Sequence, residues 1–440
     1  MRKIATIMAL AALAPAVLTA QDKVWTLSEC IDYAIEHNIS VQQTGLGVEQ
    51  QEIALNTAEN SRLPGVSGSA GQNFSFGRGL TADNTYANAN TTSTSFSLGA
   101  DVPVFNGFQI KHNIELTKLD LRAATADLEK AKDDIRVAVA QAYVQILYDM
   151  EILDVARSQV EIDEQQVFRL TEMAANGKTS RAEVSAQEAT LAQSRVSVTQ
   201  AESNLSLAIL DLTQLLELPS PDGFAVARPS VEGLESKLLL NPEQIYAEAV
   251  EVKPSIEAEK IRLDYALQNI KLAKSAFLPS LSLSGGIGSN YYTSSGYQSA
   301  AFGPQLKNNF SQYLGLNLSV PIFSRFSNRN QVKSAQLQMR NQELQLESAK
   351  KSLYKEIQQA YYNAVASQSK YRSSGVAAQS ARDAFDLAQA KYEAGKSGIT
   401  EFNESKVRLM GAESDLVQSR YEYLYQTRLL DFYRGVDMTF

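Results

Sequence analysis

The residue types that most often perform chemistry are scarce in this chain of 440 residues. Its one cysteine, Cys30, excludes an intramolecular disulfide, and its two histidines, His37 and His112, are too few for a histidine-built metal centre. The glycine-rich segment 285–288 lies in a predicted strand that no helix follows, so it is not a phosphate-binding loop. No serine has a matching histidine and aspartate, and the paired acids lack a nucleophile or metal partner. We therefore expect no enzymatic activity, no cofactor and no metal.

The composition favours long helices over several compact domains. Ala, Gln, Ser, Glu and Leu dominate and aromatic residues make up 8%, which is the mixture expected of helices that pack through small side chains. The net charge is −8, and Lys and Arg are scattered along the sequence. The sequence therefore offers no basic surface for nucleic acid.

Residues 1–20 have the pattern of a secretory signal peptide. A short positive segment precedes an apolar run that ends at Val17, and Ala20 supplies a small residue before the expected cut. The run is short for a bilayer span, and no later stretch has 18 consecutive apolar residues, so we expect export without a transmembrane helix. Cys30 lies inside a predicted helix ten residues beyond the cut, so we expect no lipid anchor there.

The rest of the chain repeats one pattern. Leu63-Pro64 recurs at an offset of 215, and three later motifs recur at an offset of 218. The later pairs are Val102–Phe105 with Val320–Phe323, Gln141–Tyr143 with Gln359–Tyr361, and Gly177-Lys178 with Gly395-Lys396. An offset held over more than seventy residues indicates an internal duplication. We predict a first repeat over 21–216, a proline-rich connector over 217–240 and a second repeat over 241–440.

Each repeat is predicted to contain two long helices, 107–175 and 180–216 in the first and 325–394 and 398–433 in the second. In the first helix apolar residues step alternately by four and three, as in a coiled-coil seam. They are Ala124, Leu128, Ala131, Ile135, Ala138 and Ala142. The shorter helices have strict seven-residue spacing, which implies supercoiling. These positions are Val184, Leu191, Val198, Leu205 and Leu212, and Phe402, Leu409, Leu416, Tyr423 and Leu430.

Each repeat also contains two segments in which apolar and small polar residues alternate. They predict strands at about 66–77, 94–104, 281–292 and 311–322. Leu314, Leu316 and Leu318, for example, alternate with Gly315 and Asn317. Alternation in pieces of about ten residues is typical of transmembrane β-strands. Any one piece would also fit a soluble sandwich, but four of them after a signal peptide favour the membrane.

Four membrane strands cannot form a closed sheet within one chain. Backbone groups in lipid must all be paired, so a spanning sheet must close into a barrel, and common barrels need about eight strands or more. Closure therefore requires several copies of the chain. Two copies would give a barrel filled by side chains, whereas three would leave room for a pore. The sequence thus predicts an α+β membrane protein that conducts rather than catalyses.

The chain resembles the TolC-like outer-membrane efflux protein family in four features taken together. These are the duplication, the Leu-Pro before each first strand, the Val-Pro-(Val/Ile)-Phe that closes each second strand, and the glycines of the helix turns. The resemblance covers residues 24–435 and implies a homotrimer in the outer membrane of a Gram-negative bacterium. Its β-strands would form a 12-stranded barrel in lipid, above a periplasmic α-barrel of 12 helices. It also implies a periplasmic adaptor that reaches an inner-membrane pump, with Gly177, Lys178, Gly395 and Lys396 at the docking turns.

The resemblance also implies a periplasmic gate. By their distance from the tip glycines, its tyrosine is Tyr392 and its acids are Glu401, Glu404 and Glu183. In a trimer the two acids of the second repeat would place six carboxylates around one axis, which would attract cations. A solvated helix face explains the same residues equally well. Ser397 stands where the family often has an arginine that ties the gate shut.

We therefore expect the exit duct of a tripartite efflux system for small toxic compounds. An alternative within the same fold is the outer-membrane channel of a type I protein secretion system. An alternative of another class is a non-conducting extracytoplasmic coiled-coil scaffold. A detergent-extracted trimer would favour a duct, and a loosely attached protein would favour the scaffold.

Overall fold

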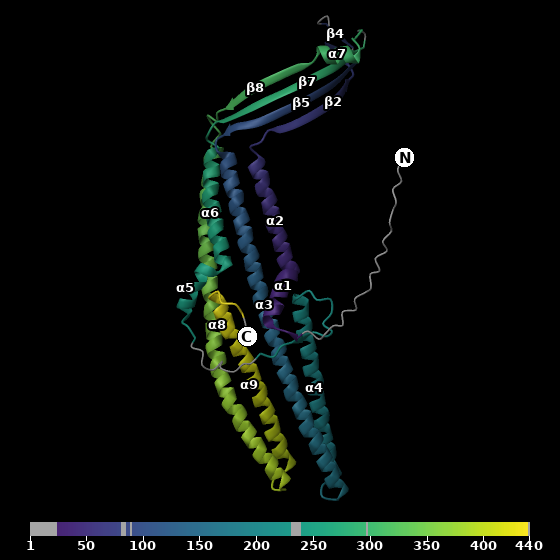
Figure 1. Cartoon of the computed structure of the whole chain (residues 1–440), viewed down its shortest axis with the longest axis vertical. Coiled ribbons are helices and arrows are strands. Elements are labelled where there is room, and N and C mark those ends of the chain that lie inside the picture. Colours follow the sequence, from purple (N-terminus) through teal and green to yellow (C-terminus); the bar gives the residue numbers. More distant parts are fainter. Residues whose placement is uncertain (1–23, 81–84, 89, 230–238, 296–297, 439–440) are drawn as a thin grey trace, which may run out of the picture. The chain divides into compact units, whose positions relative to one another are not determined.

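The computed structural model describes residues 24–80, 85–88, 90–229, 239–295 and 298–438 (Figure 1). The predicted signal peptide and part of the predicted connector, 230–238, lie outside the described residues. The helices are α1 (Leu27–His37), α2 (Ile39–Asn60), α3 (Gln109–Ala175), α4 (Arg181–Leu215), α5 (Pro242–Val252), α6 (Pro254–Ser275), α7 (Phe302–Asn308), α8 (Ser327–Glu393) and α9 (Ile399–Tyr433). The strands are β1 (Val24–Trp25), β2 (Gly65–Ser75), β3 (Arg78–Leu80), β4 (Tyr86–Asn88), β5 (Thr91–Asn106), β6 (Ala225–Val226), β7 (Ser280–Ser294) and β8 (Ser311–Ser319).

The chain forms two compact units, and each unit draws on both sequence repeats. Unit 1 consists of residues 1–39, 132–245 and 357–440, and unit 2 of residues 40–131 and 246–356. Helices α3 and α8 contribute to both units because each runs for 67 residues, about 100 Å, without a proline. None of the helices in the described ranges is long and apolar enough to cross a membrane.

The seven-residue spacing predicted for α4 and α9 is confirmed as a packing pattern. Every one of those positions is buried or half-buried, and Phe402 and Tyr423 are fully buried. In α3 the predicted seam residues are only half-buried, whereas neighbouring positions such as Ala123, Ala126 and Val139 are buried. The reason is that α3 packs against more than one helix. Ala123 and Ala126 contact α6, and Val139 belongs to a core shared with α1, so the buried face is displaced from a two-helix seam.

The core of unit 1 gathers α1, α3, α4 and α9 around the buried side chain of Tyr143. Its hydroxyl donates to the carbonyl oxygen of Ala227 at 2.7 Å and lies 3.1 Å from that of Trp25. Both carbonyls flank the small parallel sheet of β1 and β6, so this phenol fixes the sheet to the helices. Burial raises the pKa of Tyr143, which keeps the hydroxyl a donor.

Unit 2 contains an antiparallel sheet with the strand order β2-β5-β7-β8 (Figure 1). The two repeats meet at its centre, where β5 pairs with β7 from Thr91 opposite Ser294 to Asn106 opposite Ser280. The register shifts once, between Pro103 and Phe105, where an irregularity accommodates the proline. The outer strands pair with this central pair and leave β2 and β8 as edges.

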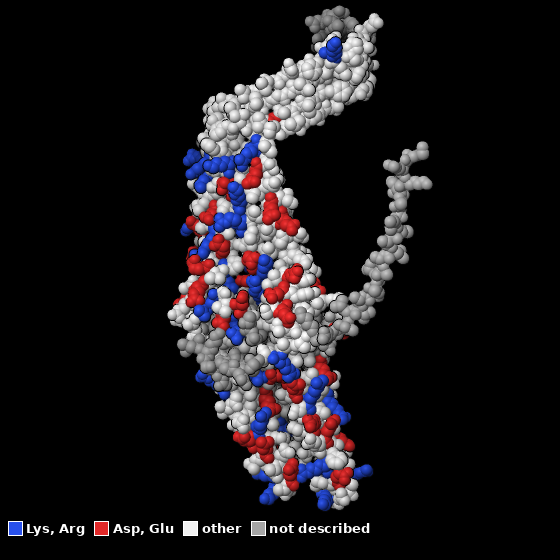
Figure 2. Space-filling model, in the orientation of Figure 1, with Lys and Arg blue, Asp and Glu red and all other residues white. Residues whose placement is uncertain are grey.

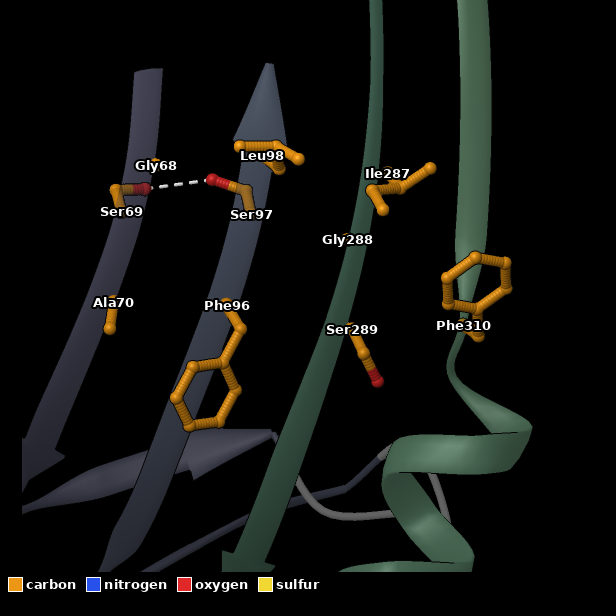
Figure 3. Close-up of a pocket in the computed structure, with 10 residues that line it drawn as sticks. All are labelled: Gly68, Ser69, Ala70, Phe96, Ser97, Leu98, Ile287, Gly288, Ser289 and Phe310. Carbon is orange, nitrogen blue, oxygen red and sulfur yellow. Dashed lines mark hydrogen bonds between the residues drawn. The ribbon is translucent and has the colours of Figure 1, made fainter. Parts of the chain in front are cut away.

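The register assigns the side chains of this sheet to two different faces, because directly opposite residues share a face. The apolar face includes Val66, Ala70, Phe96, Leu98, Val102, Leu283, Ile287, Leu314, Leu316 and Leu318. The polar face consists mainly of Ser, Gly and Asn, and its serines include Ser69 and Ser97, whose hydroxyls are 2.7 Å apart (Figure 3). The four strands carry a single charged residue, Asp101. The predicted alternation is therefore present across the whole sheet.

One glycine of the polar face is required by close packing. A Cβ at Gly286 would lie 2.8 Å from the ring of Tyr313 and 2.8 Å from the carbonyl oxygen of Leu98. The tyrosine ring therefore lies across the glycine position instead of standing away from the sheet. The Tyr313 side chain of β8 is therefore held flat against the strands on the polar face.

Candidate functional site

The turns that end the long helices have the same backbone geometry in both repeats. Gly177 and Gly395 have φ angles of 71° and 65°, the left-handed conformation that closes a helix. The Lys178 amide donates to Met173 O at 2.9 Å, and the Lys396 amide donates to the carbonyl five residues earlier at 2.8 Å. The amide of each glycine also donates to the carbonyl three residues earlier, at 3.0 Å, so each turn is a Schellman motif. The four predicted tip residues are all exposed.

The helices that leave the two turns start differently. Ser180 caps α4 by accepting a hydrogen bond from the Glu183 amide at 3.2 Å, and the Glu183 carboxylate in turn accepts one from the Thr179 hydroxyl. Helix α9 starts after Gly398, which has no side chain to cap it. Glu183 is thus fixed beside its own turn, while the start of α9 lacks this support.

Tyr392 lies half-buried between the two hairpins of unit 1. Its ring stacks on Phe402 of α9, with centroids 5.3 Å apart, and the Arg169 guanidinium of α3 lies 5.2 Å from its centroid. Burial raises the pKa of the Tyr392 phenol, the positive charge of Arg169 opposes this, and the negative charge of Glu183 adds to it. Of the predicted gate residues, Glu183 thus affects the Tyr392 phenol only through its charge, whereas Phe402 and Arg169 lie against the ring.

The two acids predicted on α9 lie on its exposed surface. The Glu401 carboxylate is 3.6 Å from the Lys391 ammonium, in a pair whose side chains are both about half exposed. Glu404 is one turn further along the same face and is also exposed. Within one chain these carboxylates are solvated, and any ring of acids would have to be completed by other copies.

The sequence did not reveal Arg169, which links α3 to the end of α8. Its guanidinium donates to the Glu393 carbonyl oxygen at 3.1 Å and lies 3.8 Å from the Glu393 carboxylate. Ser397, the predicted departure from the family pattern, has a buried hydroxyl oxygen with no hydrogen-bond partner among the described residues. A cation is thus present beside Tyr392, but it comes from the first repeat rather than from position 397.

A buried polar cluster, also missed, lies further along the hairpins from Arg169. Asp163 of α3 is fully buried and contacts the ammonium of Lys406 on α9, which is 2% exposed. Its carboxylate also accepts hydrogen bonds from Gln187 (3.0 Å), Ser194 (2.6 Å) and Gln159 (2.9 Å). We call these five residues the Asp163 cluster. It joins three helices from both repeats and satisfies a buried carboxylate completely.

A third link lies closer to the core of unit 1. The Glu151 carboxylate of α3 pairs with Arg420 of α9 and accepts a hydrogen bond from the Tyr421 hydroxyl at 2.6 Å. Along α3 the three links are 12 and 6 residues apart, which corresponds to about 18 and 9 Å. The hairpins of the two repeats are therefore connected at three levels by charged groups.

No group of three or more metal-ligating side chains is found in the described parts of the chain. The charged groups of the three links are instead paired with partners on other helices, as expected of structural contacts. These contacts hold the two hairpins of unit 1 together.

Comparison with known proteins adds a family match over most of the chain. A model described as outer membrane efflux protein matches residues 30–217 and 245–435. The outer membrane protein TolC of Escherichia coli (strain K12) is 26% identical over 358 residues, which cover 79% of this chain and 71% of TolC. The outer membrane protein OprJ of Pseudomonas aeruginosa is 25% identical over 374 residues, which cover 84% of this chain and 75% of OprJ.

The fold is shared with a solved outer membrane protein. VceC of Vibrio cholerae matches with a TM-score of 0.75 at 18% sequence identity, and the match covers 94% of this chain and 96% of VceC. At this identity the likeness concerns the fold alone.

Proposed function

Since the chain belongs to the outer membrane efflux protein family, we propose that it is the exit duct of a tripartite efflux system and conducts small toxic compounds across the outer membrane. The family and the named relatives are outer-membrane proteins, so this chain is an outer-membrane protein of a Gram-negative bacterium. The observation that carries the proposal is the sheet of unit 2, with its uncharged apolar face and its polar face, whose one charged residue is Asp101.

The open edges of that sheet support a homotrimer. Strands β2 and β8 are the edges of four paired strands, and unpaired edges are not tolerated in lipid. Three copies that pair β8 with the β2 of a neighbour would give twelve strands and a lumen wide enough to conduct. In this arrangement the apolar face contacts outer-membrane lipid and the serine-rich face lines the pore. The long helices would follow the same symmetry as a periplasmic α-barrel.

The periplasmic gate is proposed at the tips of the hairpins. The negative charge of Glu183 acts on the Tyr392 phenol, and Arg169, beside the Tyr392 ring, would supply the cation that position 397 lacks. Glu401 and Glu404, repeated three times, would form rings of carboxylates that favour cations at the aperture. Opening would require the hairpins to separate, which breaks the contacts of Arg169 with α8.

The exposed turns at Gly177-Lys178 and Gly395-Lys396 are the proposed docking surface for a periplasmic adaptor. Their repeated geometry would present two similar, protruding features to a partner. The inner-membrane pump would be reached through this adaptor. A type I secretion channel would use the same tips with a different partner, whereas a non-conducting scaffold would leave the two-faced sheet without a use.

A photocrosslinker placed at Lys396 in intact cells tests this proposal. The expected product is an adduct with an adaptor that co-purifies with a drug-exporting pump. An adaptor bound to an ATP-driven protein exporter would transfer the assignment to secretion. The same crosslinker at Lys355, an exposed position in the middle of α8, is the control. Equal labelling at both positions, or no adaptor at either, would contradict docking at the tips.

A further inference from the structure

A repeated group of aromatic and basic residues lies where the sheet of unit 2 meets its helices. Each group contains two phenylalanines and a cation at three-residue spacing, and the groups are 218 residues apart. They are Phe105, Phe108 and Lys111 in the first repeat, and Phe323, Phe326 and Arg329 in the second. The two rings of each group meet edge to face, with centroids 5.2 Å apart in the first and 5.7 Å in the second. We call these groups the junction triads.

The backbone of both triads adopts the same unusual conformation. Phe108 and Phe326 have φ angles of 66° and 64°, which bulky side chains rarely adopt. The two residues are nonetheless 51% and 59% exposed, so burial in the single chain does not explain the conformation. A strained conformation retained in both repeats points to a role for the exposed ring.

The cations of the triads belong to a basic belt at the sheet-side ends of four helices. The belt consists of eight exposed residues: Arg62, Lys111, Lys118, Lys271, Lys274, Arg325, Arg329 and Lys333. The windows 51–62, 109–118, 266–275 and 325–334 hold these eight cations and three acids, a net charge of +5 in a chain of net charge −8. Figure 2 shows Lys and Arg gathered beside the almost uncharged sheet. The fold thus assembles a basic surface from residues scattered in the sequence.

The electrostatic effect of this belt reaches a neighbouring side chain. The pKa of His112 is lowered first by burial and then by the positive charges of Lys111 and Lys271, while Glu115 opposes the shift. Two cations from different helices therefore act at the same place.

The first triad lines a hollow that has a basic side and an apolar side. Arg62, Lys111 and Lys118 line it together with Val104 and the two rings of the triad. Glu115 also contributes, but it lies 3.7 Å from Lys118 and leaves the charge of Lys111 available. Phe105 lies opposite Leu281 in the sheet, so the hollow adjoins the end of the apolar face.

We propose that the junction triads bind the phosphates of anionic phospholipids whose acyl chains cover the apolar face of the sheet. This inference rests on the proposed position of the sheet in the outer membrane. Aromatic rings favour the boundary between acyl chains and headgroups, and nearby Lys and Arg attract phosphate. An apolar surface next to the cations matches a lipid, which carries both chemistries in one molecule, better than it matches a free anion.

The test compares the K111Q/R329Q variant with K351Q/K355Q, which removes two exposed cations elsewhere on α8. Binding of phosphatidylglycerol to the detergent-purified full-length protein is measured by native mass spectrometry. We expect about fivefold weaker binding per triad in K111Q/R329Q and no change in the control. Equal loss in both variants, or none in either, would overturn the proposal. If inorganic phosphate displaced the bound lipid as effectively as added phosphatidylglycerol does, the site would be one for a free anion and not for a lipid.

Conductance of the wild-type protein in a planar bilayer separates this inference from the proposed function. A protein that conducts but binds phosphatidylglycerol equally well with and without the triad cations would overturn only the lipid sites. A protein that neither conducts nor binds lipid would overturn the proposed function and the lipid sites together.

Discussion

The hairpins of unit 1 and the sheet of unit 2 differ in how they use charged residues. Between the hairpins of unit 1, Asp163 and Lys406 are buried and fully paired. The sheet of unit 2 has one charged residue, and it exposes large apolar side chains such as Leu314 and Leu316, at 79% and 69%. Unit 1 therefore supplies its own polar partners inside the chain. The sheet has no such internal partner and depends on what surrounds it.

This difference assigns different tasks to the two regions. A buried ion pair contributes little net stability compared with apolar packing, but losing one partner is costly, so it fixes how the hairpins are paired. An exposed apolar face of this extent is unusual for a water-soluble surface and marks an interaction site. Substitutions between the hairpins of unit 1 should therefore act by leaving a buried charge without its partner. Substitutions in the sheet of unit 2 should act by changing its contact with the lipid or water around it.

The largest effect is expected from the Asp163→Leu substitution. It leaves the Lys406 ammonium buried without a counter-ion and removes the acceptor of Gln187 and Ser194. We expect the free energy of unfolding in urea to fall by about 3–5 kcal/mol. In D163L/K406M both charges are absent, and most of the loss should be recovered. A double variant as unstable as D163L would show that the pairing of charges is not the cause.

A somewhat smaller effect is expected from an arginine on the apolar face of the sheet. Leu316 lies opposite Leu283, and we expect L316R to cost about 2–4 kcal/mol in a bilayer. Asn317 is its neighbour on the polar face, so N317R should cost clearly less. The measurement is urea unfolding of both variants in lipid vesicles. Equal costs would contradict the assignment of the two faces.

Regular patterns made much of this contrast predictable from the sequence. Heptad spacing identified the buried side of α4 and α9, and alternation identified both faces of the sheet, because each pattern repeats the geometry of one element. The positive φ angles of Gly177 and Gly395 followed from glycine at a helix end. Such features depend on neighbours along the chain and not on distant partners.

The links between hairpins could not be predicted in the same way. The four-and-three stepping of α3 continues past Ala142 to Gln159, Asp163 and Gln166, which are all buried. Polar residues at seam positions were therefore a usable signal, together with Lys406 between Phe402 and Leu409 on α9. The partners of these residues lie on other helices, however, and no pattern within one helix identifies them. Arg169 was missed for the same reason.

Substitution of the tip glycines tests the energetic cost of their positive φ angles, because these residues take no part in the buried ion pairs. A Cβ at Gly177 or Gly395 would meet no atom within 4 Å, so alanine there is penalised only by the positive φ. We expect each substitution to reduce the free energy of unfolding by about 1 kcal/mol. Gly411 lies inside α9 in equally open space, and G411A should increase stability by about 0.5–1 kcal/mol. The same sign at all three positions would be inconsistent with this explanation.

The Arg169→Gln substitution tests the exposed link beside Tyr392. Its pair with Glu393 is 31% and 50% exposed, so we expect a loss of stability of at most about 1 kcal/mol. The functional effect should be clearer, because the contact with the Tyr392 ring and α8 is lost. Conductance in planar bilayers should increase in R169Q. In Y392F, which keeps the ring, it should change less, and an equal increase in both would point away from Arg169.

The smallest effect concerns Asp149, a buried acid of unit 1. No charged residue is among the causes that shift its pKa. Burial raises the pKa of Asp149 above its ordinary value of 3.8, and a hydrogen bond from Gln145 partly opposes the shift. Because the folded state favours the protonated form, Asp149 reduces stability as the pH rises from 3.8 to the folded-state pKa, and the penalty is constant above it. D149N should therefore match the wild type at low pH and be more stable at pH 7, by less than about 1 kcal/mol. Q145L removes the opposing hydrogen bond and should enlarge the pH dependence. Urea unfolding between pH 3 and 8 measures the stability of both variants. A stability advantage of D149N that shrinks as the pH rises would contradict a raised pKa. It would show that the burial of Asp149 is compensated as completely as that of Asp163.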